Sequence, residues 1–410
     1  MPFASLGLSP ALLRALATLG HQQPTPVQAE AIPAILAGED LLAQAQTGSG
    51  KTLAFALPLL QRLQPWRSGT PRRSQALVLV PTRELAQQTG AVLRALAGTL
   101  ALPPRVAVLF GGVSINPQMM GLRGGAEVIV ATPGRLLDLV EHNALQLGQL
   151  DCLVLDEADR LLDLGFADEL ARVIALLPPQ RQQLLFSATF PPAVQQLAEA
   201  LLPKARQIRI ADAPPPDIRQ RAISVDASQR TQLLRALIVE HDWPQVLVFV
   251  ATKYATELVA HKLVRAGLTA VSLHGELSQG TRSAVLAAFK AGEARVLVAT
   301  DLAARGIDIA GLPVVVNYDL PRSTADYTHR IGRTGRAGAS GLAISFISAD
   351  SEAHFRLIEK RQQQRVPREQ IAGFEPKQLA SEAQATGGVK GRRKSKKDKL
   401  REAAAAKQPG

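Results

Sequence analysis

The chain has 410 residues, of which 46% are hydrophobic and 4% aromatic, and Lys plus Arg outnumber Asp plus Glu by 47 to 35. This length is sufficient for two ordinary domains, and the composition is typical of an α/β protein. No apolar run reaches the ~18 residues of a membrane helix and no signal peptide opens the chain, so we expect a cytoplasmic protein without a membrane segment. Cys152 is the only cysteine, which excludes an internal disulfide, and its place in an apolar run predicts a buried thiol.

The first 36 residues predict short helices. Ser9 and Pro10 suit the cap and first position of a helix, and Gly20 suits its end. The PTPVQ stretch at residues 24–28 then predicts a rigid turn. The Gln28 amide both donates and accepts hydrogen bonds, so it could contact an adenine edge or cap the next helix. Taken alone, the stretch favours the capping turn.

A glycine-rich stretch at residues 45–52, AQTGSGKT, lies between a strand-like run and a helical run. This order predicts a phosphate-binding loop. Gly48 and Gly50 let backbone N–H groups turn towards phosphates, Lys51 supplies positive charge, and Thr52 can reach Mg²⁺. Ala45 replaces the usual first glycine, but the GSGKT half is intact. The sequence therefore predicts a nucleotide site that consists of Thr47, Gly48, Ser49, Gly50, Lys51 and Thr52.

Strand-like and helical runs then alternate, which predicts a parallel sheet with helical crossovers. The strand-like runs are residues 76–80, 105–110, 127–131, 152–155 and 183–186. Polar or glycine-bearing segments follow these runs, and each one alone could be a helix cap. Together, at one edge of a sheet, they predict a track for a nucleic-acid backbone. The residues concerned include Thr82, Arg83, Gly112, Thr132 and Arg135.

The stretch 151–159, DCLVLDEAD, brings three carboxylates to the end of an apolar run: Asp156, Glu157 and Asp159. Ligands of parallel sheets bind at the carboxyl ends of the strands. Adjacent carboxylates repel unless a cation lies between them and the substrate, which favours Mg²⁺. The alternative is an acidic helix N-terminus. The phosphate-binding loop elsewhere in the chain favours the Mg²⁺ site.

Three consecutive prolines within residues 211–217 interrupt the alternation and predict a semi-rigid linker. Strand-like runs resume at 221–225, 246–250, 269–273, 295–299, 313–316 and 342–347, which predicts a second parallel α/β domain without a phosphate loop. Here Arg330, Arg333 and Arg336 recur every third residue, separated by glycines. This cluster could supply arginine fingers to a triphosphate bound by the first domain, and a solvated basic loop is the alternative.

The C-terminal end differs in composition. Residues 390–407 contain nine Lys or Arg against Asp398 and Glu402, a net charge of +7 out of the +12 of the whole chain. The lack of an apolar period predicts disorder, and the segment could be a solubilising appendage or an RNA tether.

We therefore expect a first domain at 1–210, a linker at 211–218, a second domain at 219–365, a C-terminal extension at 366–380 and a basic tail at 381–410.

Together these motifs resemble those of DEAD-box ATP-dependent RNA helicases of superfamily 2, which have two RecA-like domains. PTPVQ resembles the Q motif, AQTGSGKT motif I, PTREL motif Ia, DEAD motif II and SAT motif III. ATDLAARGID and HRIGRTGR are similar to motifs of the second domain. The resemblance spans residues 3–348 in the order of the family. The opening FASLGLS and the stretch DEADRLLDLGF are most similar to the bacterial RhlE-type subgroup.

The resemblance implies ATP and Mg²⁺ as cofactors. Gln28 would contact adenine with support from Phe3, although His21 stands where the family usually has Phe or Tyr. Asp156 and Thr52 would hold Mg²⁺, and Glu157 would position or deprotonate the attacking water. Further roles would fall to Arg333 and Arg336 as arginine fingers, to Asp308 as a ribose contact, and to Asp159, Ser187, Thr189 and Arg330 in coupling hydrolysis to the domain contacts.

The resemblance also implies RNA as the partner, bound without sequence preference as single strands and short duplexes. Unwinding would be local, with the helix at residues 136–141 bending one strand. A DNA helicase and an RNA clamp that uses ATP only as a latch are the alternatives. Proteins of ribosome assembly or RNA decay would be further partners, and a monomer is expected. The implied RNA contacts are Thr82, Arg83, Gly112, Thr132 and Arg135 in the first domain and Gly275, Arg282 and Thr300 in the second.

Overall fold

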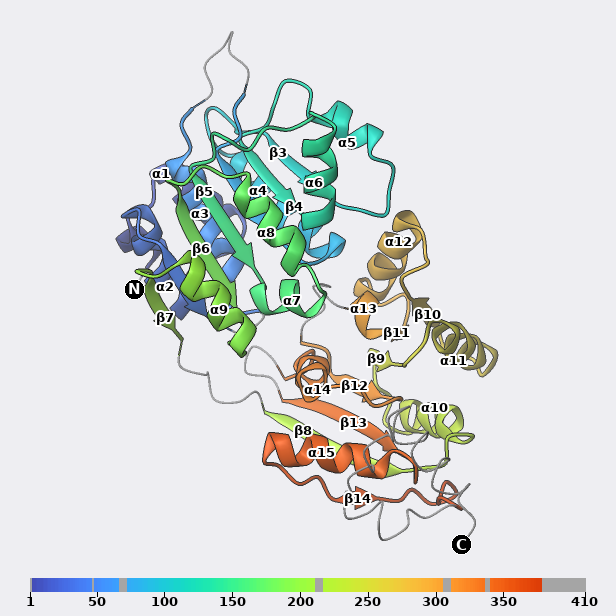
Figure 1. The fold of residues 1–410 in the computed structure, drawn as a ribbon. Helices are drawn as coiled ribbons and strands as arrows, with labels where there is room; N and C mark the ends of the chain where they lie inside the picture. The colour runs from blue at the N-terminus through green and yellow to red at the C-terminus, as the bar shows by residue number, and fades with distance from the viewer. Residues whose placement is uncertain are drawn as a thin grey trace, which may run out of the picture. The chain divides into compact units, whose positions relative to one another are not determined.

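The computed structural model describes residues 2–45, 48–65, 72–210, 217–304, 311–335 and 340–377, with the side chain of Ala325 excepted. These residues form two compact units, one up to Ile210 and one from Asp217 onward (Figure 1). Each unit is described by itself. The predicted linker prolines, the basic tail, Thr47, Asp308 and Arg336 lie outside the described residues.

The first unit contains a seven-stranded parallel sheet with the order β3-β4-β2-β5-β6-β1-β7. Every residue of the inner strands β2 and β4 is buried, as expected for a sheet that is covered on both faces. The strands are β1 (Leu41–Gln44), β2 (Ala76–Leu79), β3 (Val106–Leu109), β4 (Val128–Ala131), β5 (Cys152–Asp156), β6 (Gln182–Ser187) and β7 (Arg206–Arg209).

Helices cover both faces of this sheet (Figure 1). Val78 of β2 packs into the core under the first group of helices, and its neighbours Leu77 and Leu79 pack into the core under the second, as the alternation of side chains along a strand requires. The first group is η1 (Phe3–Leu6), α1 (Pro10–Thr18), α2 (Pro26–Leu36), α3 (Lys51–Arg62) and α4 (Arg83–Ala97). The second group includes α5 (Asn116–Gly121), α6 (Pro133–Glu141), α7 (Ala158–Asp163), α8 (Ala167–Ala175) and α9 (Pro192–Leu201).

The second unit contains another seven-stranded parallel sheet, with the order β10-β11-β9-β12-β13-β8-β14. Numbered from its own first strand, this sheet has the same strand order as the first. Its strands are β8 (Ile218–Ser224), β9 (Val246–Phe249), β10 (Ala270–Leu273), β11 (Val296–Ala299), β12 (Val314–Asn317), β13 (Gly341–Ile347) and β14 (Arg368–Glu369). Its helices are α10 (Arg230–Glu240), α11 (Lys253–Arg265), α12 (Gln279–Lys290), α13 (Asp301–Ala304), α14 (Thr324–Ile331) and α15 (Glu352–Gln362).

These two sheets confirm the prediction of two tandem α/β domains, each a parallel sheet flanked by helices. The N-terminal helix also begins as predicted, because Ser9 accepts a hydrogen bond from the Leu12 N–H and Pro10 is the first helical residue. Cys152 is half-buried against the first core rather than fully buried as predicted. Burial of the thiol itself raises its pKa to about 12, which agrees with an unreactive cysteine. Within the described residues, no helix combines the length and the apolar character that a membrane span requires.

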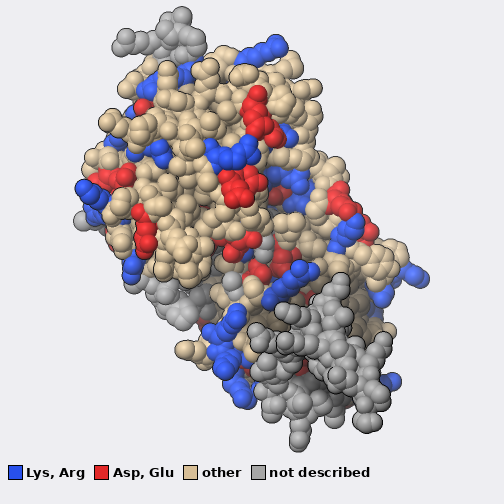
Figure 2. Space-filling model, viewed as in Figure 1, with Lys and Arg blue, Asp and Glu red and all other residues tan. Residues whose placement is uncertain are grey.

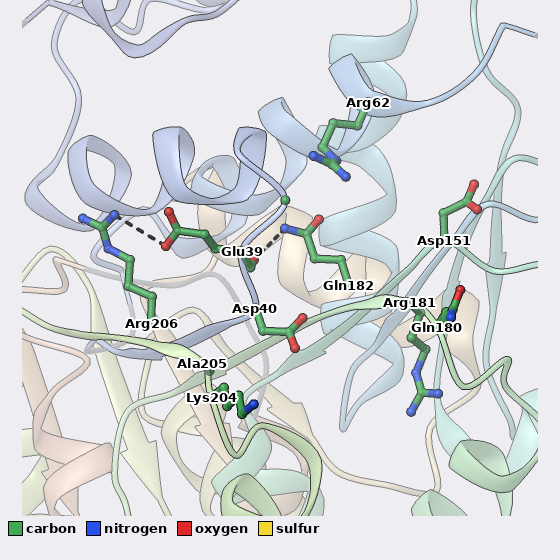
Figure 3. Close-up of a pocket in the computed structure, with 11 residues that line it drawn as sticks. Glu39, Asp40, Arg62, Asp151, Gln180, Arg181, Gln182, Lys204, Ala205 and Arg206 are labelled. Atoms are coloured by element: carbon green, nitrogen blue, oxygen red, sulfur yellow. Dashed lines mark hydrogen bonds and ion pairs between the residues drawn. The ribbon is translucent and has the colours of Figure 1, made fainter.

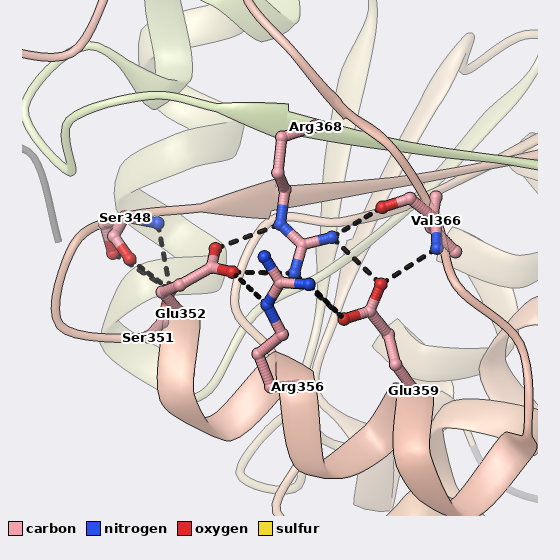
Figure 4. Close-up of polar contacts among 7 residues, drawn as sticks. All are labelled: Ser348, Ser351, Glu352, Arg356, Glu359, Val366 and Arg368. Atoms are coloured by element: carbon pink, nitrogen blue, oxygen red, sulfur yellow. Dashed lines mark hydrogen bonds and ion pairs between the residues drawn. The ribbon is translucent and has the colours of Figure 1, made fainter. Parts of the chain in front are cut away.

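The segment after α15 belongs to the second unit. Its short strand β14 pairs with β8 and forms the edge of the sheet, and Arg368 contacts both Glu352 and Glu359 of α15 (Figure 4). The Val366 N–H donates to Glu359 Oε1 at 2.8 Å. The part of the predicted C-terminal extension that the structure describes, up to Lys377, therefore lies on the sheet of this unit.

Candidate nucleotide and RNA site

The carboxyl ends of β1, β5 and β6, three neighbouring strands of the first sheet, bring the predicted nucleotide residues together. The chain leaves β1 for the glycine-rich loop, β5 ends at Asp156, and β6 ends at Ser187. The topology therefore places the phosphate loop beside the carboxylates and the SAT stretch.

The described part of the phosphate loop has the backbone that its glycines predict. Gly48 and Gly50 have φ values of 83° and 91°, in the left-handed region that favours glycine, and Gly50 caps α3. Lys51 follows with only 6% of its surface exposed, and its Nζ has no hydrogen-bond partner among the described residues. A buried ammonium without a partner is unfavourable, so this site fits an anion such as a phosphate.

Gln28 fulfils the capping function that the sequence favoured, and its contact with adenine stays a prediction. Its Oε1 accepts a hydrogen bond from the Thr25 N–H at 2.9 Å, which forms the capping box of α2. Its Nε2 donates to the Gly50 carbonyl at 3.0 Å and so links the turn to the phosphate loop. The second N–H of the amide and the second lone pair of its oxygen are left for a base edge. Phe3, the other predicted adenine contact, is 5% exposed and packs into the core.

Asp156 and Glu157 stand at the end of β5 with unusual properties. Burial raises the pKa of Asp156 to about 6, and the negative charges of Glu157 and Asp159 add to this effect while Lys51 opposes it. Glu157 has φ 52° and ψ 54°, a conformation that non-glycine residues rarely adopt. A cation beside Asp156 would stabilise its ionised form.

The donor set fits Mg²⁺ bound together with a phosphate. Among the described residues, no cluster of three or more His, Cys, Asp or Glu side chains could hold a metal alone. Mg²⁺ sites in nucleotide-binding proteins usually need only one or two carboxylates, because phosphate oxygens and water supply the remaining ligands. Asp156 and Thr52, the second residue of α3, match that requirement.

Asp159 connects the DEAD stretch to the SAT stretch by direct hydrogen bonds. Its Oδ2 accepts from Thr189 Oγ1 at 2.7 Å and from the Thr189 N–H at 3.0 Å. Its N–H donates to Ser187 Oγ at 3.3 Å, and Ser187 Oγ donates to the Thr189 carbonyl at 2.7 Å. The structure thus brings all three predicted coupling residues of the first unit together.

The predicted RNA contacts of the first unit also lie close to one another. Gly112 has a φ of 76°, in the left-handed region that favours glycine, and a Cβ built on it would lie 2.4 Å from a guanidinium nitrogen of the flexible Arg83 side chain. Arg135 donates to the Val113 carbonyl at 2.7 Å, and its Nε lies 3.5 Å from Asp138. Thr82 caps α4, and Thr132 precedes α6.

In the second unit, Arg330 is an interior residue with 2% of its surface exposed. Its guanidinium forms a two-point ion pair with Asp301 at 2.6 and 2.7 Å, and it also donates to Asn317 Oδ1 at 3.0 Å. The guanidinium lies 4.9 Å from the centre of the Phe249 ring. These contacts attach α14 to the rest of the second unit. Arg330 therefore stabilises this unit, independently of the part proposed for it in coupling hydrolysis to the domain contacts.

The predicted RNA contacts of the second unit differ in exposure. Arg282 is 2% exposed and donates to the carbonyls of His274 and Ala303, so it joins two loops from inside. Thr300 accepts from the Ala303 N–H at 3.4 Å, and nothing lies within 4 Å of a Cβ built on Gly275. Gly275 thus has open space around it and Thr300 is half-buried, whereas the Arg282 side chain is enclosed.

Sequence reasoning did not single out Thr25, Asp301 or Asn317. Thr25 carries a local signal, because Thr-x-x-Gln is a capping box. The partners of Arg330 carry no local sequence signal, since Asp301 and Asn317 are 29 and 13 residues away from it along the chain.

Comparisons with known proteins agree with this geometry. A family model described as DEAD/DEAH box helicase matches residues 25–197, and one described as helicase conserved C-terminal domain matches residues 229–338. The ATP-dependent RNA helicase DeaD of Mycobacterium tuberculosis is 42% identical over 375 residues, which cover 91% of this chain and 65% of DeaD. The chain thus spans slightly less than two thirds of the length of that relative. The ATP-dependent RNA helicase DbpA of Escherichia coli is 45% identical over 353 residues, which cover 86% of this chain and 76% of DbpA.

Solved structures give the same result. S. cerevisiae Dbp5 bound to RNA and ADP BeF3 is similar with a TM-score of 0.78 at 34% identity, covering 91% of this chain and 95% of that one. A DEAD box protein from the hyperthermophile Methanococcus jannaschii has a TM-score of 0.53 at 35% identity, covering 90% of this chain and 99% of that one. The RhlE subgroup stays a prediction, because these relatives have other names. The two family models, in the order and with the residues at which they match, show that the chain belongs to the DEAD-box family of ATP-dependent RNA helicases.

Proposed function

We propose that the protein binds RNA, unwinds short duplexes locally, and hydrolyses ATP to ADP and phosphate in an RNA-stimulated reaction. The observation that carries this proposal is the buried Lys51 ammonium, which has no hydrogen-bond partner among the described residues and interacts electrostatically with Asp156. An ammonium in this position would be stabilised by hydrogen bonds to an anion, and a nucleoside triphosphate would supply one.

Each residue of the first unit would have a defined part in hydrolysis. Lys51 and the loop N–H groups would bind the phosphates, and the remaining N–H of Gln28 would contact adenine. Asp156 and Thr52 would hold Mg²⁺, which neutralises phosphate charge when it is bound. Glu157 would orient a water molecule and accept its proton at the carboxylate.

The second unit would complete the reaction. We propose Arg333 and Arg336 as the arginine fingers that stabilise charge on the transferred phosphoryl group, and Asp308 as a ribose contact. RNA would lie against Thr82, Arg83, Gly112, Thr132 and Arg135 of the first unit and against Gly275, Arg282 and Thr300 of the second. Arg282 would act through the backbone that it supports, since its side chain is buried.

ATP and RNA would increase the affinity for each other. If both ligands favour the same arrangement of the two units, each must raise the affinity for the other by the same factor. Asp159, Ser187 and Thr189 are the bonded group through which the nucleotide site would influence the interdomain contacts. Hydrolysis would then release both ligands.

The names of similar proteins support this function. The Dbp5 structure contains RNA together with ADP BeF3, and DeaD and DbpA are named ATP-dependent RNA helicases. Proteins of ribosome assembly or RNA decay as partners, a monomeric state and a cytoplasmic location remain predictions from the sequence.

The test is RNA-stimulated ATP hydrolysis measured beside displacement of a short RNA strand, with Lys51→Ala as the inactive control. We expect hydrolysis to rise with RNA, to rise much less with DNA of the same sequence, and to accompany displacement. Hydrolysis without displacement would instead favour the ATP-latched clamp. Equal stimulation by DNA would favour a DNA helicase, and hydrolysis that ignores nucleic acid would contradict the proposal.

A further inference from the structure

A pocket of about 630 Å³ lies at the amino ends of the strands of the first sheet (Figure 3). Its lining comes from the end of α3 and from the segments that lead into β5, β6, β1 and β7, which are neighbours in the sheet. Because all strands are parallel, this edge is opposite to the carboxyl edge that carries the phosphate loop and the DEAD stretch. The pocket therefore shares no residue with the nucleotide site described above.

The carboxylates of the pocket already have partners. Glu39 pairs with Arg206 at 3.6 Å. Asp151 pairs with Arg73, outside the pocket, at 2.8 Å. Asp40 Oδ1 accepts from the Gln183 N–H at 2.7 Å.

Three cations of the pocket have no carboxylate within ion-pair distance among the described residues. Arg62 donates to the carbonyls of Ile35 and Leu36 at the end of α2, at 3.3 and 2.9 Å. Arg181 donates to the Pro178 carbonyl and to the side chain of Gln183. Lys204 has no ion-pair partner in the described part of the chain. Figure 3 shows Arg62 and Lys204 at opposite sides of the view, with Asp40 and Gln182 drawn between them.

The charge of Arg181 is only partly compensated by the protein. Burial lowers the pKa of this guanidinium, and Asp40 opposes the effect without reversing it. Arg181 Nε is buried and has no hydrogen-bond partner among the described residues. Arg62, in contrast, is held in position by carbonyl groups, which carry no net charge to offset its own. A group of cations oriented by neutral acceptors is suited to an anionic ligand.

We propose that this pocket binds a phosphate group through Arg62, Arg181 and Lys204, either from a free polyphosphate or from the RNA backbone. A volume of about 630 Å³ exceeds the needs of a bare ion and lies in the range of small-molecule pockets. Guanidinium groups match the geometry of phosphate oxygens, and Lys204 adds a flexible point charge. Only the RNA source rests on the proposed function. The free polyphosphate source does not.

Asp40 limits the affinity of the pocket and so provides a test in both directions. Its carboxylate repels an anion, but the hydrogen bond that it accepts from Gln183 needs only a carbonyl-type oxygen. Asp40→Asn keeps that acceptor and removes the charge. It should therefore strengthen phosphate binding, whereas loss of the cations should weaken it.

The experiment compares the wild-type chain, the Arg181→Gln/Lys204→Gln variant and Asp40→Asn by titration calorimetry with inorganic pyrophosphate. Binding at the phosphate loop contributes equally in all three proteins, so their differences report the pocket. We expect at least about tenfold weaker binding in the double variant, because two charge-assisted hydrogen bonds to phosphate are absent, and stronger binding in Asp40→Asn. Arg14→Gln/Arg172→Gln removes the same charge from exposed positions outside the pocket and should match the wild type.

The affinity of the same proteins for single-stranded RNA at several salt concentrations identifies the source. If the RNA backbone enters the pocket, the salt slope of the double variant should fall by about 0.7 for each phosphate that the pocket no longer neutralises. A changed pyrophosphate affinity with an unchanged slope would assign the pocket to a free polyphosphate. Equal pyrophosphate binding and equal slopes in all variants would overturn the proposal. RNA-stimulated hydrolysis in the wild-type chain checks the proposed function separately.

Discussion

Glu157 occupies a strained backbone position between the buried Asp156 and the helix α7. Glu157→Gln keeps the size of the side chain and removes the group that accepts a proton. We expect ATP and RNA binding to persist while kcat falls by about 10²–10⁴-fold, because the proposed Mg²⁺ ligand Asp156 is unchanged. Nucleotide affinity and single-turnover hydrolysis, measured on one preparation, separate the two effects.

Glu199→Gln is the matched control. It makes the same chemical change at a residue on the exposed face of α9. Its turnover should equal that of the wild type. Turnover of Glu157→Gln within a few-fold of the wild type would remove Glu157 from the proposed chemistry.

Asp156 makes the ligand-free protein less stable at neutral pH. Burial raises the pKa of this carboxyl from its ordinary 3.8 to about 6. The folded chain therefore favours the neutral acid more than the unfolded chain does. This contribution to the stability is fully present below about pH 4, and it is lost as the pH rises through about 6. Asp156→Asn should therefore stabilise the first unit at pH 7.5 by up to about 3 kcal/mol.

Thermal unfolding of Asp156→Asn and the wild type, with a chelator and at several pH values, tests this sign. The gain in Tm should shrink towards zero near pH 4, while Mg²⁺-dependent hydrolysis should be lost at every pH. A variant that is less stable than the wild type at pH 7.5 would show that the ionised carboxylate stabilises the fold.

The helix α14 depends on Arg330 for its attachment to the second sheet. Arg330→Ala would leave Asp301, the first residue of α13, and Asn317, the last residue of β12, without their buried partner. We expect a loss of about 3–5 kcal/mol in the free energy of unfolding of this unit. Arg322→Ala, at an exposed position before α14, is the control and should have almost no effect. If Arg330→Ala lowers activity without lowering stability, Arg330 acts in coupling alone.

The segment that follows α15 stabilises the second unit through Arg368. Its guanidinium lies 4.7 Å from the Phe355 ring centre and bonds Glu352 at 2.8 Å and Glu359 at 3.0 Å (Figure 4). Burial alone would raise the pKa of Glu359, but the hydrogen bonds from Arg368 and from the Val366 N–H and the nearby positive charges together lower it. The stability from this carboxylate is therefore present above its ordinary pKa and is lost as the pH falls below it.

Arg368→Ala should destabilise the second unit by about 3 kcal/mol, because two mostly buried carboxylates lose their partner. The difference from the wild type should diminish in acid, where Glu359 becomes protonated in both proteins. Arg361→Ala removes an exposed arginine at the end of α15 and serves as the control. A difference that grows on acidification would contradict the assigned direction of the Glu359 pKa.

The inner strands and the phosphate loop could be predicted from the sequence because their signals are local. Runs such as Ala76–Leu79 are buried on both faces and therefore continuously apolar. The edge strands β7 and β14 escaped prediction, since edge positions admit the polar residues of Arg206–Arg209 and Arg368–Glu369. The regular spacing of the arginines likewise gave no sign that Arg330 is buried, because its partners come from other strand ends.

At the scale of the whole chain, two sheets of the same strand order carry different chemistry. Only the first has a phosphate-loop sequence among its strand–helix turns, while the second has the buried Arg282 and Arg330 on its helices α12 and α14. Lys and Arg are interspersed with Asp and Glu over the visible face of the first unit (Figure 2). Much of the net charge instead lies in residues 390–407, which carry +7 of the total +12.

The basic tail should then contribute to RNA affinity rather than to chemistry. The described chain ends at Lys377, whose N–H donates to Asp226 Oδ2 at 2.9 Å beside the start of α10, so the tail continues from the second unit. Several cations in one segment gain affinity by releasing counterions from phosphates, and their attachment raises the effective concentration of RNA near the units. Deleting residues 390–410 should weaken RNA binding and flatten its salt dependence, by about 0.7 in slope for each RNA phosphate that the tail neutralises.

The same deletion should leave the ATPase rate at saturating RNA almost unchanged, because every residue proposed for catalysis precedes Ser348. A tail of equal length in which the nine Lys and Arg residues are replaced by Gln separates the effect of charge from that of chain length. If charge is responsible, this variant should behave like the deletion in both affinity and salt slope. Affinity and slope equal to those of the wild type in both variants would make the tail a solubilising appendage, and a lower maximal rate would show that it takes part in the reaction cycle.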